Sequence, residues 1–574
     1  MRKLSRLVLP MIGLGALGLI RCVGDAGVPS DGGSDVTTQN DGSPSDVNTN
    51  DVSPSDGSAG DGEAGPPPPP TPDGGIVWFN HYNMNEGMND IATTDPQGNL
   101  VVVGSLRTCS GCSSSSSDYQ THIGGFALPG TPPSVGQDAL IAKLNSSGSA
   151  VWARSLSAVP SDAGLFAYSD DYITSVAVDG NGDIYIAGYT QSHSITLKNT
   201  LNGPCAFVGK LSADGTSYLW DHAYTATGYV NSPILAVNGT KVAVTMGYNG
   251  TLSYDSGQNV AAVGNLDVFV GLLSTTDGST TWHQSIGGSG NDSVSDVAMT
   301  STGDVVIGGV FASATVAGNG TGFPLTQLGT NQNAFVAKLA AADGTALFTL
   351  AYGDSASAGD TTINAVAEHN GKLAIAGSFG GTNVDFGKGG GQTTTGGQDG
   401  FLVLFDESSK QTSALTLLTG DQYDYVSGVA FDAWGSYVAT GVYGSTGSTS
   451  AKLGSQTLPN TGFHTQGTFV AKLDPTGNLT WVNAYHPTAS DGGVNYSVPD
   501  AATESYLDLW GSRVRTDANG RVYVVGGMNG PAIWGSTGYQ QRLSTLGSEY
   551  VIFCYPNPCP PVLASDGLVG AWLP

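Results

Sequence analysis

Four aspartates recur at one position of a repeated segment, where together they could bind a cation or a polyhydroxyl ligand. Each lies eight residues before the end of the first strand expected in its repeat, and the four are Asp171, Asp292, Asp360 and Asp424. Carboxylate oxygens are the ligands that calcium prefers, and convergent polar groups also hold small polar ligands. The alternative is structural, because aspartate commonly accepts hydrogen bonds from the N–H groups of a turn. Calcium is therefore the one cofactor that the sequence suggests.

No sequence pattern predicts a catalytic residue. The eight histidines form neither an HExxH nor a His-x-His pattern, and the sequence has no Gly-x-Ser-x-Gly elbow and no P-loop. Residues 179–183, DGNGD, place oxygen atoms at alternate positions as the start of a calcium loop does. The bidentate glutamate that should follow is missing, so a hairpin turn is the better interpretation.

A repeat of four short strands must position the aspartates. In residues 171–225 the segments SVAVD, IYIAGY, AFVGKL and YLWDHAYT are rich in alternating β-branched and aromatic residues, which predicts strands. The Asp-, Asn- and Gly-rich links between them suit hairpin turns. Third-strand segments recur in seven copies, which read DALIAKL, CAFVGKL, DVFVGLL, NAFVAKL, DGFLVLF, GTFVAKL and EYVIFCY.

The length of the repeat predicts the architecture. Large apolar residues, mostly tryptophan, mark the units at intervals of 62 to 91 residues, whereas solenoids repeat at about 20 to 45 residues. Four strands with their loops at this length suit a propeller blade. We therefore expect an all-β fold, a single seven-bladed β-propeller of four-stranded antiparallel blades over residues 76–574.

The repeat pattern also resembles a known family. Asp/Asn-x-Phe-Val-x-Lys-Leu, then Asp-Gly or Thr-Gly, Trp, a Gly-Asn turn and Ile-Tyr-Ile-Ala-Gly is similar to the SBBP-like β-propeller repeat of bacterial surface and secreted proteins. The Asp-Gly turns before Trp220 and Trp282 resemble the Asp-box hairpins of sialidase propellers, which are structural. Both resemblances imply a propeller and leave the activity open.

Antiparallel connections sort the loops onto two faces of such a ring. Short turns lie on one face, and the long loops lie on the other, where we expect a ligand to bind. The long loops are residues 106–137, 191–204, 311–333 and 444–467. For closure of the ring, we expect the N-terminal strand 76–82 to pair with residues 549–555 and the C-terminal residues 569–573 to pack outside.

The N-terminal residues predict export and lipid anchoring. Arg2, Lys3 and Arg6 precede an apolar stretch at residues 7–20 of signal-peptide length. The run ends at Cys22 and resembles a bacterial lipobox, although Arg21 stands where a small residue is expected. Residues 1–22 are thus expected to be a lipoprotein signal peptide of a Gram-negative-type bacterium with lipidation at Cys22.

The composition predicts a tether and argues against nucleic acid as a partner. Residues 23–75 are rich in Asp, Gly, Ser and Pro and are expected to be a disordered tether. The formal charge of −27 argues against nucleic acid, because phosphate binding requires clustered Lys and Arg.

Five further cysteines fit an oxidising compartment. Two pairs are close in sequence, Cys109 with Cys112 and Cys554 with Cys559, and predict two local disulfides, with a zinc site as the alternative. Cys205 is left over and is expected to be a buried thiol at the start of a strand.

Two classes of function remain open at this stage. The first is a surface-tethered, non-catalytic monomer in the outer membrane that binds a protein or glycan partner through its long-loop face. The second is an extracellular propeller enzyme, either a glycan lyase or glycosidase or a quinoprotein-type dehydrogenase. A glycosidase needs two carboxylates at a defined separation, and the aspartates show no asymmetry that would separate an acid from a base. The first class is favoured.

Overall fold

The structure is a computed structural model that describes most of the repeat region. It describes residues 76–82, 88–93, 99–107, 121–123, 126–128, 137–156, 170–191, 194–318, 323, 325–354, 359–445, 450–459, 462–487, 490–491, 494–495, 507–529, 532–534, 541–542 and 565–572. The predictions for the signal peptide 1–22, the tether 23–75 and Cys22 lie outside these residues. The two predicted cysteine pairs also lie outside them, at Cys109, Cys112, Cys554 and Cys559.

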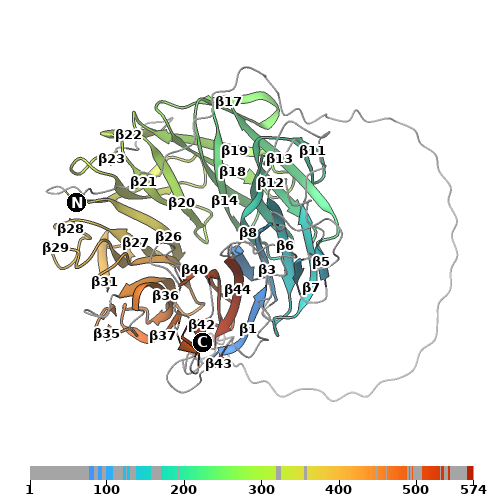
Figure 1. Ribbon diagram of the computed structural model, residues 1–574. Coiled ribbons are helices and arrows are strands. Elements are labelled where there is room, and N and C mark those ends of the chain that lie inside the picture. The colour runs from blue at the N-terminus through green and yellow to red at the C-terminus, as the bar shows by residue number, and fades with distance from the viewer. Residues whose placement is uncertain are drawn as a thin grey trace, which may run out of the picture.

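The described strands form six large sheets, of which two have four strands and three have six, and in these five all pairs are antiparallel (Figure 1). From the inside outward, the four-stranded sheets are β2 (Met88–Thr93), β3 (Leu100–Arg107), β6 (Gln137–Leu144), β7 (Ala150–Leu156); and β20 (Asp292–Met299), β21 (Val305–Phe311), β24 (Asn333–Leu339), β25 (Ala346–Tyr352). The six-stranded sheets are β8 (Asp171–Val178), β9 (Ile184–Thr190), β12 (Cys205–Leu211), β13 (Tyr218–Ala226), β16 (Thr251–Tyr254), β17 (Gln258–Ala261); β14 (Val230–Asn238), β15 (Lys241–Tyr248), β18 (Asp267–Ser274), β19 (Thr280–Gly287), β22 (Thr315–Gly318), β23 (Leu325–Thr326); and β26 (Thr361–His369), β27 (Lys372–Phe379), β30 (Asp399–Asp406), β31 (Gln411–Thr419), β34 (Lys452–Leu453), β35 (Gln456–Thr457).

The sixth sheet has ten strands and corrects the expectation of seven separate blades. Its strands are β32 (Tyr425–Phe431), β33 (Tyr437–Ser445), β36 (Gly462–Leu473), β37 (Leu479–Pro487), β40 (Leu507–Thr516), β41 (Val522–Asn529), β44 (Ser565–Trp572), β1 (Ile76–Tyr82), β42 (Ala532–Trp534) and β43 (Gln541–Arg542). Two four-stranded meanders, one from β32 to β37 and one from β40 to β1, are joined in it. The 12-residue strand β36 extends past its own meander and pairs in parallel with the start of β40, at Thr465↔Leu507 and Gln466↔Asp508.

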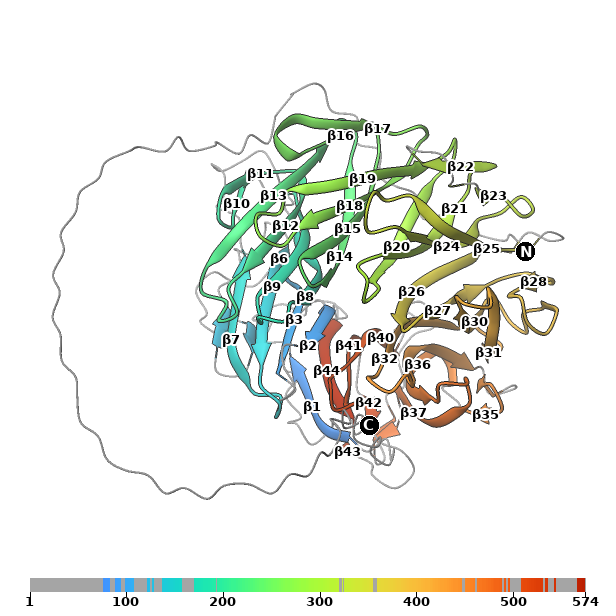
Figure 2. The ribbon, with the colours of Figure 1, turned by 180° about the vertical axis from the view of Figure 1, so that it is seen from behind.

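The inner strands of these units form a closed ring. In order around the ring, each contacts the next, and the last contacts the first: β2, β8, β14, β20, β26, β32 and β40. Figure 2 shows the same ring from behind, with the inner strands near its centre. Short two-stranded sheets complete the described strands, and they are β4 (Thr121–Ile123) with β5 (Phe126–Leu128), β10 (Ser194–Thr196) with β11 (Thr200–Asn202), β28 (Val384–Asp385) with β29 (Gly391–Gln392), and β38 (Ser490–Asp491) with β39 (Val494–Asn495).

Burial follows the position of a strand within its sheet. Each side chain of the third strand β12 is buried, because the sheets on both sides cover its two faces. The fourth strand β13 contains both buried and partly exposed residues. The apolar cores therefore lie between neighbouring sheets, where Tyr185 and Val208 of one sheet pack with Val244 and Phe269 of the next. The all-β prediction is confirmed.

The N-terminal strand closes the ring, as predicted. Strand β1 pairs with β44, and β44 pairs with β41, so segments from the two ends of the chain lie side by side (Figure 1). The prediction that residues 569–573 pack outside the ring is wrong, because residues 569–572 belong to β44. This strand takes the third position that the sequence suggests for residues 549–555, which lie outside the described part of the chain. The apolar run there looks more like a third strand than the glycine-containing SDGLVGAW does.

Within the described residues, several connections between the second and third strands of a sheet contain hairpins. The hairpin β16–β17 follows β15 in the chain but pairs with β13 of the preceding sheet. In the same way β22 pairs with β19, β34 with β31 and β42 with β37. Each hairpin thus covers the outer edge of a neighbouring sheet, an edge that would otherwise be open to pairing with another chain.

Candidate functional site

The four predicted aspartates occupy equivalent positions on one face of the ring. Asp171 and Asp292 begin β8 and β20, and Asp360 and Asp424 directly precede β26 and β32. The long connections arrive at this end of the inner strands. Asp171, Asp292 and Asp424 are buried, whereas Asp360 is exposed.

The aspartates hold the nearby backbone. The Oδ2 of Asp292 accepts hydrogen bonds from the N–H of Gly288 and from the Oγ of Ser313, both at 2.8 Å. The Oδ1 of Asp424 accepts one from the N–H of Gly444 at 2.8 Å. Among the described residues, no group of three or more His, Cys, Asp or Glu side chains is arranged to hold a metal ion. Calcium binding by these four residues stays a prediction.

One of these carboxyl groups has a strongly displaced pKa. Burial raises the pKa of Asp424 to about 8, and the neighbouring carboxylates of Asp399 and Asp421 act in the same direction. The hydrogen bond from Gly444 acts against them. Asp424 is therefore a carboxyl group that retains its proton near neutral pH.

The DGNGD segment is a hairpin turn, as its missing glutamate suggests. The Oδ1 of Asp179 accepts hydrogen bonds from the N–H groups of Asn181 (2.9 Å) and Asp183 (3.0 Å), and its Oδ2 accepts one from Tyr185 (2.9 Å). Lys210 lies 2.8 Å from the carboxylate of Asp183. The carboxylate oxygens of Asp179 are thus occupied by hydrogen bonds from within the hairpin.

The inner strands share a feature that the sequence analysis missed. Each contains a β-bulge, and in several the extra residue is polar. Asn89 donates to the carbonyl of Ile173 on the next inner strand at 2.9 Å, and Asn364 donates to the carbonyl of Val426 at 3.0 Å. Thr174 makes the equivalent bond to Pro233. The bulges therefore link neighbouring inner strands around the axis.

A partly buried arginine crosses the axis. Arg513 on β40 lies 3.3 Å from the carboxylate of Asp296 and donates to the backbone carbonyls of Ser295 (3.2 Å) and Asn364 (3.4 Å). The carboxylates of Asp296 and Asp90 favour its charged form. The guanidinium thus ties β40 to β20 and β26 on the other side of the ring.

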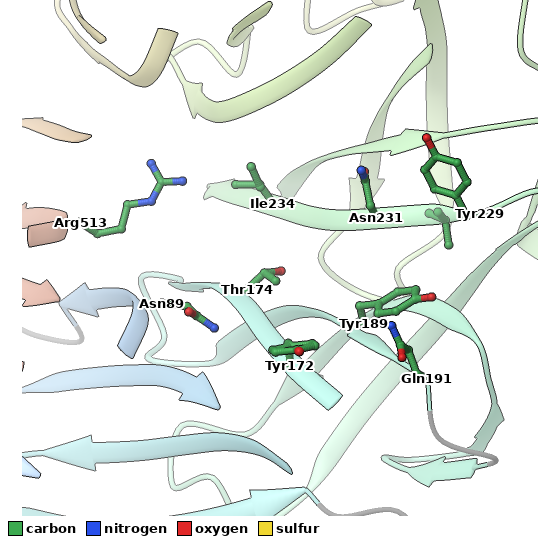
Figure 3. Close-up of a pocket in the computed structure, with 10 residues that line it drawn as sticks. Asn89, Tyr172, Thr174, Tyr189, Gln191, Tyr229, Asn231, Ile234 and Arg513 are labelled. Atoms are coloured by element: carbon green, nitrogen blue, oxygen red, sulfur yellow. The ribbon is translucent and has the colours of Figure 1, made fainter. Parts of the chain in front are cut away.

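A cavity of about 530 Å³ opens beside this arginine, and we call it the axial pocket. Its lining residues are Asn89, Tyr172, Thr174, Tyr189, Gln191, Tyr229, Val230, Asn231, Ile234 and Arg513. In Figure 3, Tyr172, Tyr189 and Gln191 lie along one side, Tyr229 and Asn231 face them, and Arg513 lies at one end. The ends of β8, β9 and β14 that line the pocket are on the long-loop face, which is the face on which the sequence analysis expects binding.

The geometry of the strands brings the aromatic rings of this pocket together. Tyr172 and Tyr189 are register partners on β8 and β9. Burial raises the pKa of Tyr189, so that its phenol stays neutral. Tyr229 directly precedes β14 and is 51% exposed. Asn231 accepts a hydrogen bond at Oδ1 from the N–H of Gly247 (3.1 Å), which fixes its amide.

The residues of the axial pocket can stack against a ligand and form hydrogen bonds with it. Tyrosine rings supply flat apolar surfaces with a polar end, and amides supply both donors and acceptors. The ten lining residues include no carboxylate, histidine or cysteine. The four aspartates do not line the pocket. The polar residue at the bulge of an inner strand was the one sequence signal that could have indicated the pocket, since Asn89 and Thr174 are such residues and both line it.

Of the cysteine predictions, one falls within the described residues. Cys205 is a buried thiol and is the first residue of β12, as predicted. In the described part of the chain, no helix is both long and apolar enough to cross a membrane.

The ring of antiparallel sheets and its axial pocket define a β-propeller protein. The model of the family described as "SBBP: Beta-propeller repeat" matches residues 152–194. No curated protein matches the chain.

Several solved structures are similar to this chain at low identity. One is described as the structure of the Dos1 propeller (10% identity, TM-score 0.38, covering 87% of this chain and 96% of that one). Another is the WD40 domain of SCAP from fission yeast (9%, 0.34, 87% and 97%). A third is the quinohemoprotein alcohol dehydrogenase ADHIIG from Pseudomonas putida HK5 (10%, 0.30, 68% and 61%). None of these similarities carries an argument about function.

Proposed function

We propose that this chain is a non-catalytic binding module, a surface-tethered propeller that binds a protein or glycan partner through its long-loop face. The observation that carries the proposal is the axial pocket, which combines three tyrosines with three side-chain amides on that face. Pockets of about 300 to 1,000 Å³ with a few placed polar groups are typical ligand sites. In two of the four predicted long loops, the hairpins β22–β23 and β34–β35 cover the edge of a neighbouring sheet, which favours the pocket over these loops as the binding site.

The composition of the pocket favours binding over hydrolysis. A glycosidase places two carboxyl groups on either side of the bond that it cleaves. The lining residues of the axial pocket provide amides, phenols and one arginine. Their chemistry suits stacking and hydrogen bonding, and it supports the binding class over the glycosidase alternative.

The tether belongs to the same proposal. The basic residues and apolar stretch within residues 1–22 support export, and Cys22 is the residue that would carry the lipid. Residues 23–75 would then hold the propeller away from the outer membrane as a polar, proline-containing spacer. We propose that the protein acts there as a monomer.

Blocking one face at a time tests the proposal. In the full-length protein, Gln191→Cys places a thiol at the rim of the axial pocket, and Ser301→Cys places one on the opposite, short-turn face. Each variant is labelled with a bulky maleimide and applied to a glycan array and to an array of purified envelope proteins, beside the equally treated parent protein.

We expect the label at residue 191 to abolish the specific signal on the arrays, and the label at residue 301 to leave it intact. The reverse result would move the binding site to the short-turn face. A parent protein that binds neither array would contradict the binding function.

A further inference from the structure

We infer that the axial pocket binds a neutral oligosaccharide. This inference rests on the proposed binding function and names its ligand class. Three properties of the pocket carry it, namely its aromatic surfaces, its amides and the compensated charge of its arginine.

The aromatic surfaces suit the faces of a sugar ring. Tyr172 and Tyr189 lie next to each other on paired strands, and Tyr229 stands on the opposite side of the pocket (Figure 3). Tyr229 leaves 51% of its surface exposed although it directly precedes a strand of the inner ring. A pyranose presents apolar C–H groups on its faces, and covering the exposed ring of Tyr229 with such a face removes apolar surface from water.

The amides suit the hydroxyl groups at the edge of the sugar. Asn231 is held by the N–H of Gly247, which binds its Oδ1 and leaves its NH₂ group as a donor of fixed direction. Gln191 is exposed at the rim and belongs to the same wall as Tyr189. A hydroxyl group is both a donor and an acceptor, so a site with donors and acceptors on facing walls matches a polyhydroxyl ligand better than an apolar one.

The charge of the pocket favours a neutral ligand. Its one charged residue, Arg513, is paired with Asp296 at 3.3 Å and donates to two backbone carbonyls. The guanidinium is therefore engaged in the wall of the ring. The formal charge of the chain, −27, also repels acidic polysaccharides at long range. A neutral sugar needs no free cationic partner in the pocket, and the negative charge of the chain does not repel it.

Two equivalent tyrosines provide a matched test. Tyr229 and Tyr423 each stand two residues before an equivalent point of an inner strand, Asn231 in β14 and Tyr425 in β32, and they are 51% and 61% exposed. Only Tyr229 lines the axial pocket. Tyr229→Ala and Gln191→Ala therefore remove ligand contacts, and Tyr423→Ala is the control on the same face.

The experiment measures binding of the full-length protein by calorimetry. The neutral probes are malto-, cello- and chito-hexaose, the acidic probe is a galacturonate hexamer, and near-ultraviolet circular dichroism checks that each variant is folded. We expect at least one neutral probe to bind, Tyr229→Ala to weaken that binding about tenfold, and Tyr423→Ala to leave it unchanged.

Three results would overturn the inference. Binding of the galacturonate hexamer alone would make the ligand class acidic. Equal effects of Tyr229→Ala and Tyr423→Ala would show that the sugar binds elsewhere. Failure of all sugars, while a label at residue 191 still blocks binding to an envelope protein, would reject the saccharide and retain the proposed binding function.

Discussion

A single tryptophan explains why the repeats place Asp-Gly in the turn between the third and fourth strands. The indole N–H of Trp282 donates to the carbonyl of Ala341 in the corresponding turn of the next sheet, at 3.0 Å. Gly344 in that turn has a φ of +73°, and a Cβ there would lie 2.6 Å from the Cε3 of Trp282. The preceding Asp343 accepts hydrogen bonds from the N–H and hydroxyl of Thr345, which lower its pKa. The motif is therefore a joint between sheets.

Substitution of this glycine tests the joint. Gly344→Ala should destabilise the protein by about 2 to 4 kcal/mol, because it adds both a strained backbone and a contact with the indole. Gly371 is the matched control, since its φ is +78° but a Cβ there meets nothing within 4 Å. Gly371→Ala should cost about 1 to 2 kcal/mol. Urea unfolding monitored by fluorescence measures both values, and equal losses would show that the tryptophan contact adds nothing.

The proposed lipid anchoring depends on one residue, Cys22. We expect the wild-type protein to sediment with the outer membrane, because acylation of this cysteine adds apolar chains that partition into lipid. Cys22→Ala should release the protein into the soluble fraction. Fractionation with mass spectrometry of the mature N-terminus measures this, with Cys205→Ala as the cysteine control. A soluble wild type that begins at another residue would refute the lipoprotein proposal.

At the scale of elements, two buried carboxyl groups lie at strand ends on the long-loop face, one beside an inner strand and one on a third strand. Asp424 precedes β32 and has a pKa of about 8 because of burial. Its neighbour Asp399, the first residue of β30, also has a raised pKa because of burial. Both are aspartates at strand starts, and the chain packs them in adjacent sheets. Their protonation is therefore linked to the contact between these sheets.

The raised pKa of Asp424 predicts a pH dependence of stability. In the unfolded chain an aspartate loses its proton near pH 4, whereas in the folded protein Asp424 keeps it until about pH 8. Between these values the folded state binds more protons, so the free energy of unfolding falls as the pH rises. We expect this contribution to be fully present below pH 4 and lost by about pH 8.

Asp424→Asn isolates this contribution, because asparagine resembles the protonated carboxyl group and can still accept from Gly444. The variant should match the wild type at pH 4 and be more stable at pH 8 by on the order of a few kcal/mol. Denaturation curves at several pH values measure the difference. Asp360→Asn, at the exposed equivalent position, should leave the slope unchanged. A wild-type slope in Asp424→Asn would refute the assignment.

At the scale of the whole molecule, the sequence predicts the ring but not the connections across it. Alternating apolar residues and Asp-Gly turns depend on local structure, so the strands and turns of the repeat could be predicted. The pairing of the β16–β17 hairpin with β13, and that of β36 with β40, join segments that no local pattern connects. The axial pocket could not be predicted from the sequence for the same reason. Asn89, Tyr229 and Arg513 lie far apart in the chain, and only closure of the ring brings them together.

Closure of the ring by both chain ends gives the last prediction. Strand β44 lies between β41 and β1, so deletion of residues 565–574 leaves β1 without its partner strand and opens the ring. Deletion of residues 76–82 breaks the same closing pair but leaves β40, β41 and β44 paired with one another, so that only the outer edge of β44 is newly exposed. We therefore expect the C-terminal deletion to lower the midpoint of urea unfolding more and to broaden the transition, because the ring no longer unfolds as one unit. Hydrogen exchange should show that the C-terminal deletion removes amide protection from residues 76–82, whereas the N-terminal deletion leaves residues 522–529 protected. Unchanged protection of residues 76–82 after the C-terminal deletion would place β44 outside the ring.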